Sequence, residues 1–389
     1  MRYLSVLISN IFVNVPTVLL VLLYAHFGTF ANSASLGIAL AYAAPVYLFF
    51  SMQHGVAILG GNVTWGDATA LRVKLAPLYL ASAVAISLVY KEWLILLVVL
   101  YRFGDLLYEP VFCERMRVGD SRRMLLGSGG RLLIFIIGLL LGFAFSLELA
   151  HVLAILAGLN IAMALWSAGS QWHASFWRTT PNWGGLLMGA GACLAGLSVN
   201  VPRYFLVGAP ASDLAAYSNI LTVVMAGTLL FVSFNNIFFA RAARIGRHGV
   251  VSFFVRSSLL GLLASPLAWL LVVNDFMVAK VLIGLGLGTR YQPYANLLPL
   301  FWVFYCMLSL QNVANCVLIY LGGSRQIFIS NLLLLMFLVA GFLVSQGTTT
   351  SYRALTIVIA SMAVFLLILF LMVLFRLGVG RGFLRKFTA

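Results

Sequence analysis

The most informative feature of this 389-residue chain is its shortage of charge: only 8% of the residues are charged, and nine are Asp or Glu. A soluble globular domain carries about 25% charged residues. At the same time 63% of the residues are hydrophobic, and the mean hydropathy is +1.06. This combination excludes a soluble enzyme or binding domain and indicates a polytopic membrane protein.

Signatures of metal binding and of common enzyme classes are also lacking. The four cysteines, Cys113, Cys193, Cys306 and Cys316, occur singly in apolar segments. No pair of the five histidines has the spacing of metal ligands. There is no Walker loop, His-Glu-x-x-His motif or nucleophile elbow, and the loops are short. We therefore expect no metal, no cofactor and no enzymatic activity.

What the chain does contain is a series of apolar runs of about 18–25 residues, each able to cross the hydrocarbon core as a helix. They lack the alternation of barrel strands, so we predict an all-α polytopic membrane protein with about twelve transmembrane helices. The first run is too long for a signal-peptide core and is expected to remain as a membrane helix. The expected spans are 3–24, 35–59, 75–90, 93–115, 124–147, 149–171, 184–207, 213–239, 250–273, 294–320, 326–345 and 353–376, with 276–292 left ambiguous.

The spans divide into two sets of six. We expect an N-terminal six-helix lobe at 1–171, a polar cytoplasmic linker at 172–183 and a C-terminal six-helix lobe at 184–389. The tetrapeptide Val-Asn-Val-Pro occurs in the first span of each set, at 13–16 and 199–202. Because six is even, both lobes would start on the same side of the membrane. The pattern therefore predicts a parallel repeat around a central cavity.

The net charge of +15 could indicate a nucleic-acid partner, but the positions of the charges argue against one. Lys and Arg lie in alternate loops, seventeen on the side of Arg2 and four on the other. Arg72 and Lys74 are counted among the seventeen. Positive residues favour the cytoplasmic side, so both termini are expected there. The bilayer is thus the expected partner, and no nucleic acid is.

The stretch 198–206 places a proline and an arginine inside a span, and both are costly there. One interpretation is that Arg203 snorkels into the headgroups. The other is a helix broken at Pro202 that lines a wet cavity, with Arg203 facing an anionic cargo. The repeat places a corresponding break at Asn14 and Pro16.

A second group of charges lies in the fourth span. Arg102, Asp105 and Glu109 follow i, i+3, i+7 spacing, which puts them on one helix face. Arg102 could bridge both carboxylates in a structural network, or Asp105 and Glu109 could couple transport to a proton or cation. Polar residues in other spans either bond to neighbouring helices or line the cavity. The further cavity candidates are Asn200, Tyr204, Arg131, Asn312 and Asn315.

Three segments resemble the Wzx-type polysaccharide flippases. They are 198–219, with Asn-Val-Pro-Arg-Tyr followed by Gly208 and Asp213; 101–119, with Tyr-Arg-Phe-Gly-Asp; and 285–291, Leu-Gly-Leu-Gly-Thr-Arg-Tyr. The resemblance implies membership of the multidrug/oligosaccharidyl-lipid/polysaccharide exporter superfamily. It further implies two six-helix lobes that open alternately to each side of the bacterial inner membrane, moving undecaprenyl-diphosphate-linked oligosaccharide without ATP hydrolysis.

The arginines agree with this interpretation, because guanidinium groups of Arg203, Arg131 and Arg102 would suit a diphosphate. The expected partners are a lipid-linked oligosaccharide and the bilayer, with other polysaccharide-assembly membrane proteins as candidates. Two alternatives stay open. A cation-coupled multidrug exporter of the same fold would favour a neutral or negative cavity. A polymerase or ligase acting on the same lipid carrier would have a long periplasmic loop with a carbohydrate-sized groove.

The topology can be tested with reporter fusions that are active only in the periplasm. We expect a reporter placed after Gly208 to be active and one fused at Ala389 to be silent, because the positive loops lie with the termini. An active reporter at Ala389 would contradict the twelve-span topology.

Overall fold

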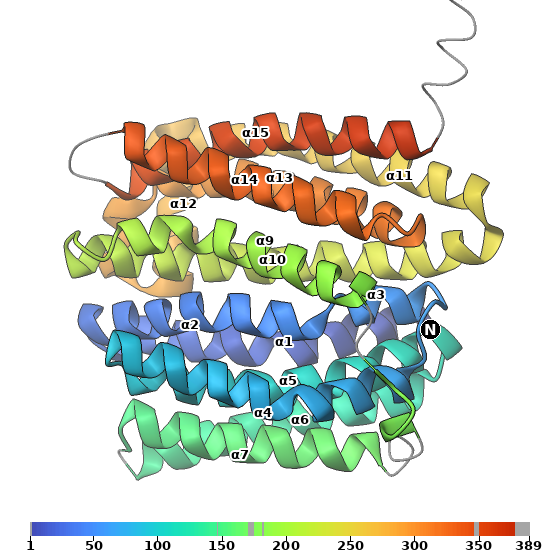
Figure 1. Cartoon of the computed structure of the whole chain (residues 1–389). Helices are drawn as coiled ribbons and strands as arrows, with labels where there is room; N and C mark the ends of the chain where they lie inside the picture. Colours follow the sequence, from blue (N-terminus) through green and yellow to red (C-terminus); the bar gives the residue numbers. More distant parts are fainter. Residues whose placement is uncertain (1, 146, 170–174, 181–182, 346–349, 378–389) are drawn as a thin grey trace, which may run out of the picture.

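The computed structural model describes residues 2–145, 147–169, 175–180, 183–345 and 350–377, and its regular elements in these ranges are all helical (Figure 1). The predicted fold class is therefore confirmed as all-α. The helices are α1 (Arg2–Phe27), α2 (Phe30–Ser51), α3 (His54–Leu59), α4 (Trp65–Tyr90), α5 (Trp93–Val118), α6 (Ser121–Ala144), α7 (Leu149–Ala168), α9 (Trp183–Phe205), α10 (Ala211–Ile245), α11 (Arg247–Ala264), η1 (Ser265–Leu267), α12 (Ala268–Leu287), η2 (Thr289–Tyr294), α13 (Leu297–Tyr320), α14 (Ser324–Val344) and α15 (Ser351–Arg376).

Ten helical segments in the described part of the chain are long and apolar enough to cross a membrane. The protein is thus a polytopic membrane protein, as predicted. Two further helices, α5 with 26 residues and α10 with 35, lie among them and exceed the length needed to span the hydrocarbon. The twelve-span topology itself stays a prediction.

The third predicted span began too late. α4 starts at Trp65, ten residues before the expected 75, because Thr64 caps it by accepting a hydrogen bond from the Asp67 amide at 3.2 Å. Arg72 and Lys74 therefore lie within a helix and not in a loop. The polar first turns of α4 had concealed the true start of the helix.

The ambiguous segment 276–292 consists of the second part of α12 and the short helix η2. α12 bends sharply within residues 273–276, where three consecutive residues, Asn274, Asp275 and Phe276, have positive φ. The segment is therefore a short helical excursion between α11 and α13.

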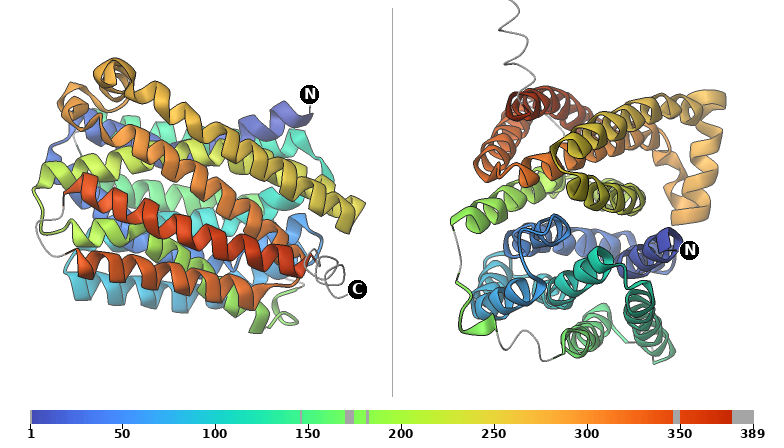
Figure 2. Two further views of the ribbon diagram at one scale, coloured as in Figure 1. Left: turned by 90° about the horizontal axis from the view of Figure 1, so that it is seen from above. Right: turned by 90° about the vertical axis from the view of Figure 1, so that its right-hand side faces the viewer.

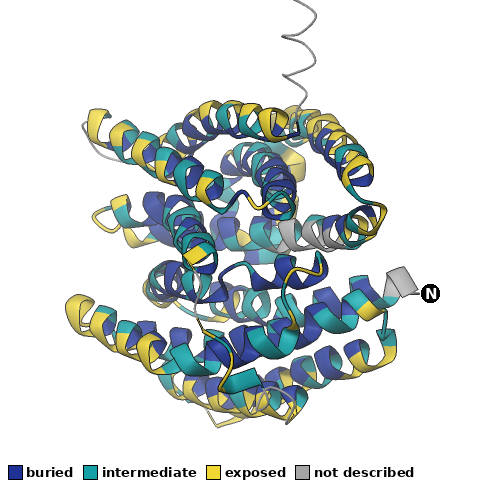
Figure 3. Ribbon diagram, turned by 45° about the vertical axis from the view of Figure 1, so that its right-hand side comes forward, coloured by how far each residue is buried: buried dark blue, intermediate teal, exposed yellow. Residues whose placement is uncertain are grey.

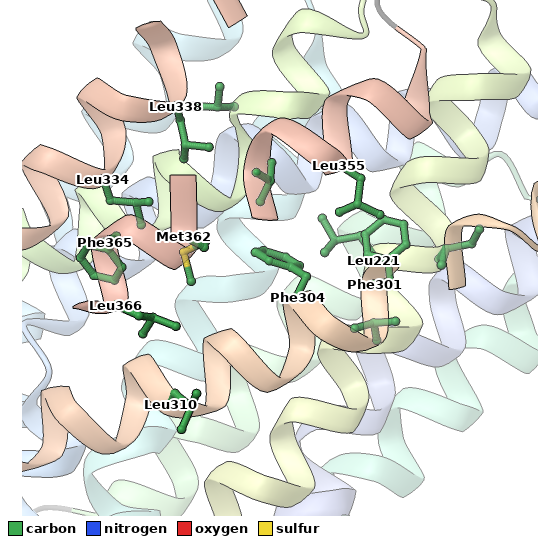
Figure 4. Close-up of a cluster of buried hydrophobic side chains, with 14 of the residues drawn as sticks. Leu221, Phe301, Phe304, Leu310, Leu334, Leu338, Leu355, Met362, Phe365 and Leu366 are labelled. Carbon is green, nitrogen blue, oxygen red and sulfur yellow. The ribbon is translucent and has the colours of Figure 1, made fainter. Parts of the chain in front are cut away.

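The first seven helices lie together on one side of the molecule, and α9 to α15 lie on the other (Figures 1 and 2). The buried apolar clusters largely follow this division. One is built from α1, α2 and α4 to α7, and another is drawn mainly from α9 to α15 and includes Phe301, Phe304 and Phe365 (Figure 4). The predicted division into six-helix lobes at 1–171 and 184–389 stays a prediction. Of the predicted linker, residues 172–174 and 181–182 lie outside the described residues.

The outer surface of the bundle is apolar. Large hydrophobic residues are exposed, among them Leu263, Trp269, Leu282 and Leu371. Exposed positions recur along the outer faces of the helices (Figure 3). In water such a surface would aggregate, whereas in a bilayer it faces lipid tails. The surface therefore fits a protein that is surrounded by lipid.

The two groups of helices meet where α1 and α2 lie against α9 and α10. Small residues allow close approach there. A Cβ atom on Gly37 would lie 2.6 Å from the Cβ of Ser218, and one on Gly196 would lie 2.7 Å from a methyl carbon of Leu48. A Cβ on Gly189 would meet the backbone oxygen of Phe49. Small residues that let backbones approach are typical of helix interfaces in membranes.

The predicted helix breaks at the two prolines are wrong. α1 is continuous through Pro16, and α9 continues through Pro202 to Phe205. A proline removes one backbone hydrogen bond, and a buried membrane helix can continue past that loss. The local structure does repeat, because the side-chain amides of Asn14 and Asn200 each donate to the carbonyl four residues earlier, at 2.8 Å. The break in this region lies instead between α2 and α3, at residues 52–53 with positive φ.

Because α2 and α9 are in close contact, we expect Gly189→Ala to lower the free energy of unfolding of the detergent-solubilised protein by roughly 1–3 kcal/mol. The added methyl group meets a backbone oxygen that cannot move aside. Gly158→Ala in α7 is the matched control, since a Cβ there meets nothing within 4 Å. Thermal unfolding followed by tryptophan fluorescence measures both. Equal unfolding temperatures for the two variants would contradict the packing described.

Candidate functional site

A cavity of about 490 Å³ lies between the two groups of helices, within the range of small-molecule sites, about 300–1,000 Å³. Its wall is formed by α1, α2, α5, α9, α10 and α13, together with Gln53 in the break between α2 and α3. None of the described lining residues is Asp or Glu. The polar lining residues are Asn14, Thr17, Gln53, Arg102, Asn200, Arg203, Thr222, Ser309, Gln311, Asn312 and Asn315.

Arg203 is buried in the wall of this cavity, with 6% of its surface exposed. Its Nη1 donates to the side-chain oxygen of Asn200 at 2.8 Å, and its Nη2 donates to the carbonyl of Ser218 at 3.1 Å. These partners are neutral, and the buried Nε has no protein partner. The guanidinium therefore packs against α10 without a compensating carboxylate, and the snorkelling interpretation does not fit.

Arg102 brings a second positive charge to the cavity from α5. Its Nη1 lies 3.2 Å from Asp105, and its guanidinium lies over the ring of Tyr47 at 5.6 Å. Asp105 is held more closely by Arg131, at 2.5 Å. Because Arg131 already balances the charge of Asp105, Arg102 contributes an excess positive charge, and 29% of its side chain is exposed.

The expectation that Arg102 bridges both carboxylates of its helix is therefore wrong. Glu109 pairs with Arg72, at 2.8 Å, and Arg72 is fully buried. Arg72 also donates to the carbonyl of Ser51 at 3.0 Å, at the end of α2, and to the carbonyl of Leu106. The sequence analysis missed Arg72 because it placed this residue in a loop. The capping sequence Thr64-x-x-Asp67 was the signal that would have placed it inside a helix.

Arg131 does not line the central cavity. Its Nε donates to Asn160 at 3.0 Å, and its guanidinium lies over the ring of Tyr108 at 4.4 Å. It borders a separate small pocket that is also lined by Pro16. Arg131 thus balances Asp105 inside the first group of helices, and it is withdrawn from the binding residues.

Tyr204 also lies outside the cavity wall. Its hydroxyl donates to the carbonyl of Ala41 at 2.8 Å, and its ring stacks on Tyr42 with centroids 4.9 Å apart. It therefore joins the two groups of helices. Asp105 and Glu109 are likewise absent from the described lining, and both are paired with arginines. Their contacts form a structural network with Arg72 and Arg131 in addition to Arg102, and a coupling role for them stays a prediction.

The remaining cavity candidates, Arg102, Arg203, Asn200, Asn312 and Asn315, all line the cavity. Sequence reasoning missed four polar lining residues, Thr17, Gln53, Thr222 and Ser309. The repeat could have found Thr17, because it occupies the position in the first half that Arg203 occupies in the second.

No protein-family model matches the sequence, and no curated protein matches it. Solved structures do. An outward-facing multidrug resistance transporter of the MATE family of the MOP superfamily superposes with a TM-score of 0.59 and 13% identity, over 97% of this chain and 96% of the other. The eukaryotic MATE transporter AtDTX14 gives a TM-score of 0.55 and 15% identity, over 96% and 95%.

A third similar structure is a MOP superfamily transporter from Pyrococcus furiosus, for which a binding pocket of reverse polarity suggests a different function. Its TM-score is 0.59 and its identity 13%, over 97% of this chain and 95% of that one. This chain has the fold of the MATE transporters. At such identity the likeness shows the fold alone, and the function depends on the residues that line the cavity.

We expect Glu109→Gln to lower the free energy of unfolding of the protein by up to about 3 kcal/mol, because it leaves the buried charge of Arg72 unpaired. The double variant Arg72→Met, Glu109→Leu should lose less free energy of unfolding than Glu109→Gln, because it leaves no unpaired charge. Thermal unfolding in detergent measures both.

Glu114→Gln provides the control for this prediction. Glu114 pairs with Arg117 at 2.7 Å near the end of α5, where the Arg117 side chain is 40% exposed. Loss of this ion pair should lower the free energy of unfolding by less than about 1 kcal/mol. A Glu109→Gln variant as stable as Glu114→Gln would mean that Arg72 does not depend on this carboxylate.

Proposed function

We propose that this chain is a flippase that translocates undecaprenyl-diphosphate-linked oligosaccharide units across the bacterial inner membrane by alternating access. In this proposal residues 1–171 and 184–389 act as two six-helix lobes, and both termini are cytoplasmic. The observation that supports it is the positive charge of the cavity lining. Arg102 and Arg203 line it, and no acidic residue does in the part of the wall that is described.

A positive charge held inside a membrane protein without a partner is costly, so it is retained where it serves a function. Two incompletely compensated charges border one cavity here: Arg203 on α9 has neutral hydrogen-bond partners, and Arg102 on α5 shares its carboxylate with Arg131. Guanidinium groups bind phosphate oxygens through paired hydrogen bonds, and poor hydration strengthens them. A diphosphate would neutralise both groups at once. A lipid carrying one is therefore the cargo that fits this wall best.

The competing function is export of cationic drugs by the same fold. Such a cargo would favour a neutral or negative wall, and the two arginines would repel it. The MOP transporter from Pyrococcus furiosus, with its pocket of reverse polarity and suggested different function, supports the view that pocket charge and cargo vary together within this fold.

Alternating access requires that contacts between the lobes form and break. Arg290 from η2 donates to the carbonyl of Gly28 at 2.8 Å and lies over the ring of Phe30 at 4.8 Å, and His26 approaches the carbonyl of Gly286 at 3.0 Å. These contacts join the lobes at the end that the proposed topology places outside. Cargo release to the periplasm would break them.

The proposal predicts that Arg203→Gln lowers the affinity for a polyprenyl diphosphate by roughly one to two decades, since a charge-assisted hydrogen bond is worth about 1.5–3 kcal/mol. Arg203→Lys should recover part of the affinity, because an ammonium keeps the charge and loses the fork. Binding to the purified protein and surface polysaccharide in a strain that depends on it are the two measurements.

Arg256→Gln is the matched control, because it removes the same charge from an exposed position of α11 outside the described cavity lining. It should leave binding and surface polysaccharide unchanged. Membrane levels of every variant are compared in parallel. Normal binding and normal polysaccharide with a well-expressed Arg203→Gln variant would remove the anionic cargo from the proposal.

A further inference from the structure

The inner face of α13 carries amides that the packing of the protein leaves unpaired. Asn312 and Asn315 both line the cavity, and with Leu308 they follow i, i+4, i+7 spacing, so one helix face presents all three. The Nδ2 of Asn312 and the Oδ1 of Asn315 are buried and have no hydrogen-bond partner in the protein. Buried polar atoms are nearly always paired, so two such atoms on one cavity wall call for an explanation.

Several other membrane-embedded amides in the described chain bond to neighbouring groups, and Asn235 on α10, whose buried Nδ2 is also unpaired, lies outside the described cavity lining. Asn160 donates to the carbonyl of Tyr101 at 2.8 Å, and Gln311 donates to Asn331 at 3.1 Å. Asn10 donates to the carbonyl of Val6 at 3.1 Å. Those contacts tie the protein together, which is the usual role of amides in membrane helices. Asn312 and Asn315 differ because their open groups border a cavity large enough for a ligand.

Asn312 and Asn315 lie away from Arg203 along the cavity. Arg203 lies two residues before the end of α9, near the turn into α10. Asn315 lies five residues before the end of α13, and Gln53 lines the cavity beside α3, which packs against α13. The chain order of the helices places the end of α9 and the end of α13 at opposite ends of the bundle, where α12 and α3 respectively lie in Figure 1. Arg203 and the two amides are thus separated along the cavity, whereas Arg102, which lies over the ring of Tyr47 near the end of α2, is on the side of Gln53.

We propose that Asn312 and Asn315 form a subsite for neutral sugar units of the cargo, separate from Arg203, which would bind its diphosphate. The subsite rests on the flippase function proposed above. A carboxamide presents a donor and an acceptor, and a sugar hydroxyl or acetamido group offers the complement of both. The amides carry no charge, so they give no preference for an acidic sugar. A site built from such groups discriminates against an analogue that leaves them unpaired.

The test compares the affinities of the purified full chain for two kinds of lipid. One probe is polyprenyl diphosphate without sugar, and the others carry a single neutral hexose or N-acetylhexosamine. The wild type should bind at least one glycosylated probe more tightly than the bare diphosphate. Asn312→Leu and Asn315→Leu should each reduce that preference by roughly three- to tenfold, while leaving affinity for the bare diphosphate within about twofold.

Asn10→Leu is the matched control, because it makes the same substitution in a membrane helix outside the described lining and should keep the wild-type preference. Arg203→Gln should weaken all probes alike. A wild type that binds bare and glycosylated diphosphates equally, or asparagine variants that keep the wild-type preference, would overturn the sugar subsite while the flippase proposal stands. A wild type that binds none of the lipids would overturn the flippase proposal and the subsite with it.

Discussion

The cost of placing charge in a medium of low dielectric constant governs the interior of this protein. Four of the arginines within these helices bear this cost most directly, Arg72, Arg102, Arg131 and Arg203, and each needs a compensating partner. Arg72 and Arg131 have one, in Glu109 and Asp105. Arg203 has only neutral oxygens, and Arg102 shares a carboxylate that is already balanced. The two incompletely matched arginines are the two that reach the cavity. Charge compensation thus separates the arginines that hold the fold from those free to bind an anion.

The matched pairs also explain how the first group of helices is joined. Glu109 on α5 connects to α4 through Arg72, which reaches on to the end of α2. Asp105, one turn earlier, connects to α6 through Arg131 and to α7 through Asn160. Lipid tails are as apolar as leucine, so packing and polar contacts, and not exclusion of water, must hold membrane helices together. The charged stripe of α5 therefore supplies contacts that an apolar helix would lack.

The sequence predicted the features that depend on local physics. Apolar run length gave the helices, and the repeated Val-Asn-Val-Pro sequence corresponds to two asparagines that make the same local hydrogen bond. The predictions failed where the position of a side chain depends on a partner from another helix. Spacing along α5 suggested that Arg102 serves Glu109, but Arg72 on α4 lies closer, and no property of a single helix reveals that. Arg131 was assigned to the cavity by charge alone, although Asn160 and Tyr108 hold it elsewhere.

The asymmetry of the repeat bears on how a ligand could move the two groups of helices. Thr17 stands where the second half has Arg203, so the first half draws its positive charge from Arg102 on a different helix. The cavity consequently has one excess cation from each half. A ligand shifts a conformational equilibrium only by its difference in affinity between the states. An anion held by one half would move with it and favour neither state. The affinity for an anion bound by both arginines would depend on the distance between the two halves. Its binding could therefore favour one relative position of the halves over another.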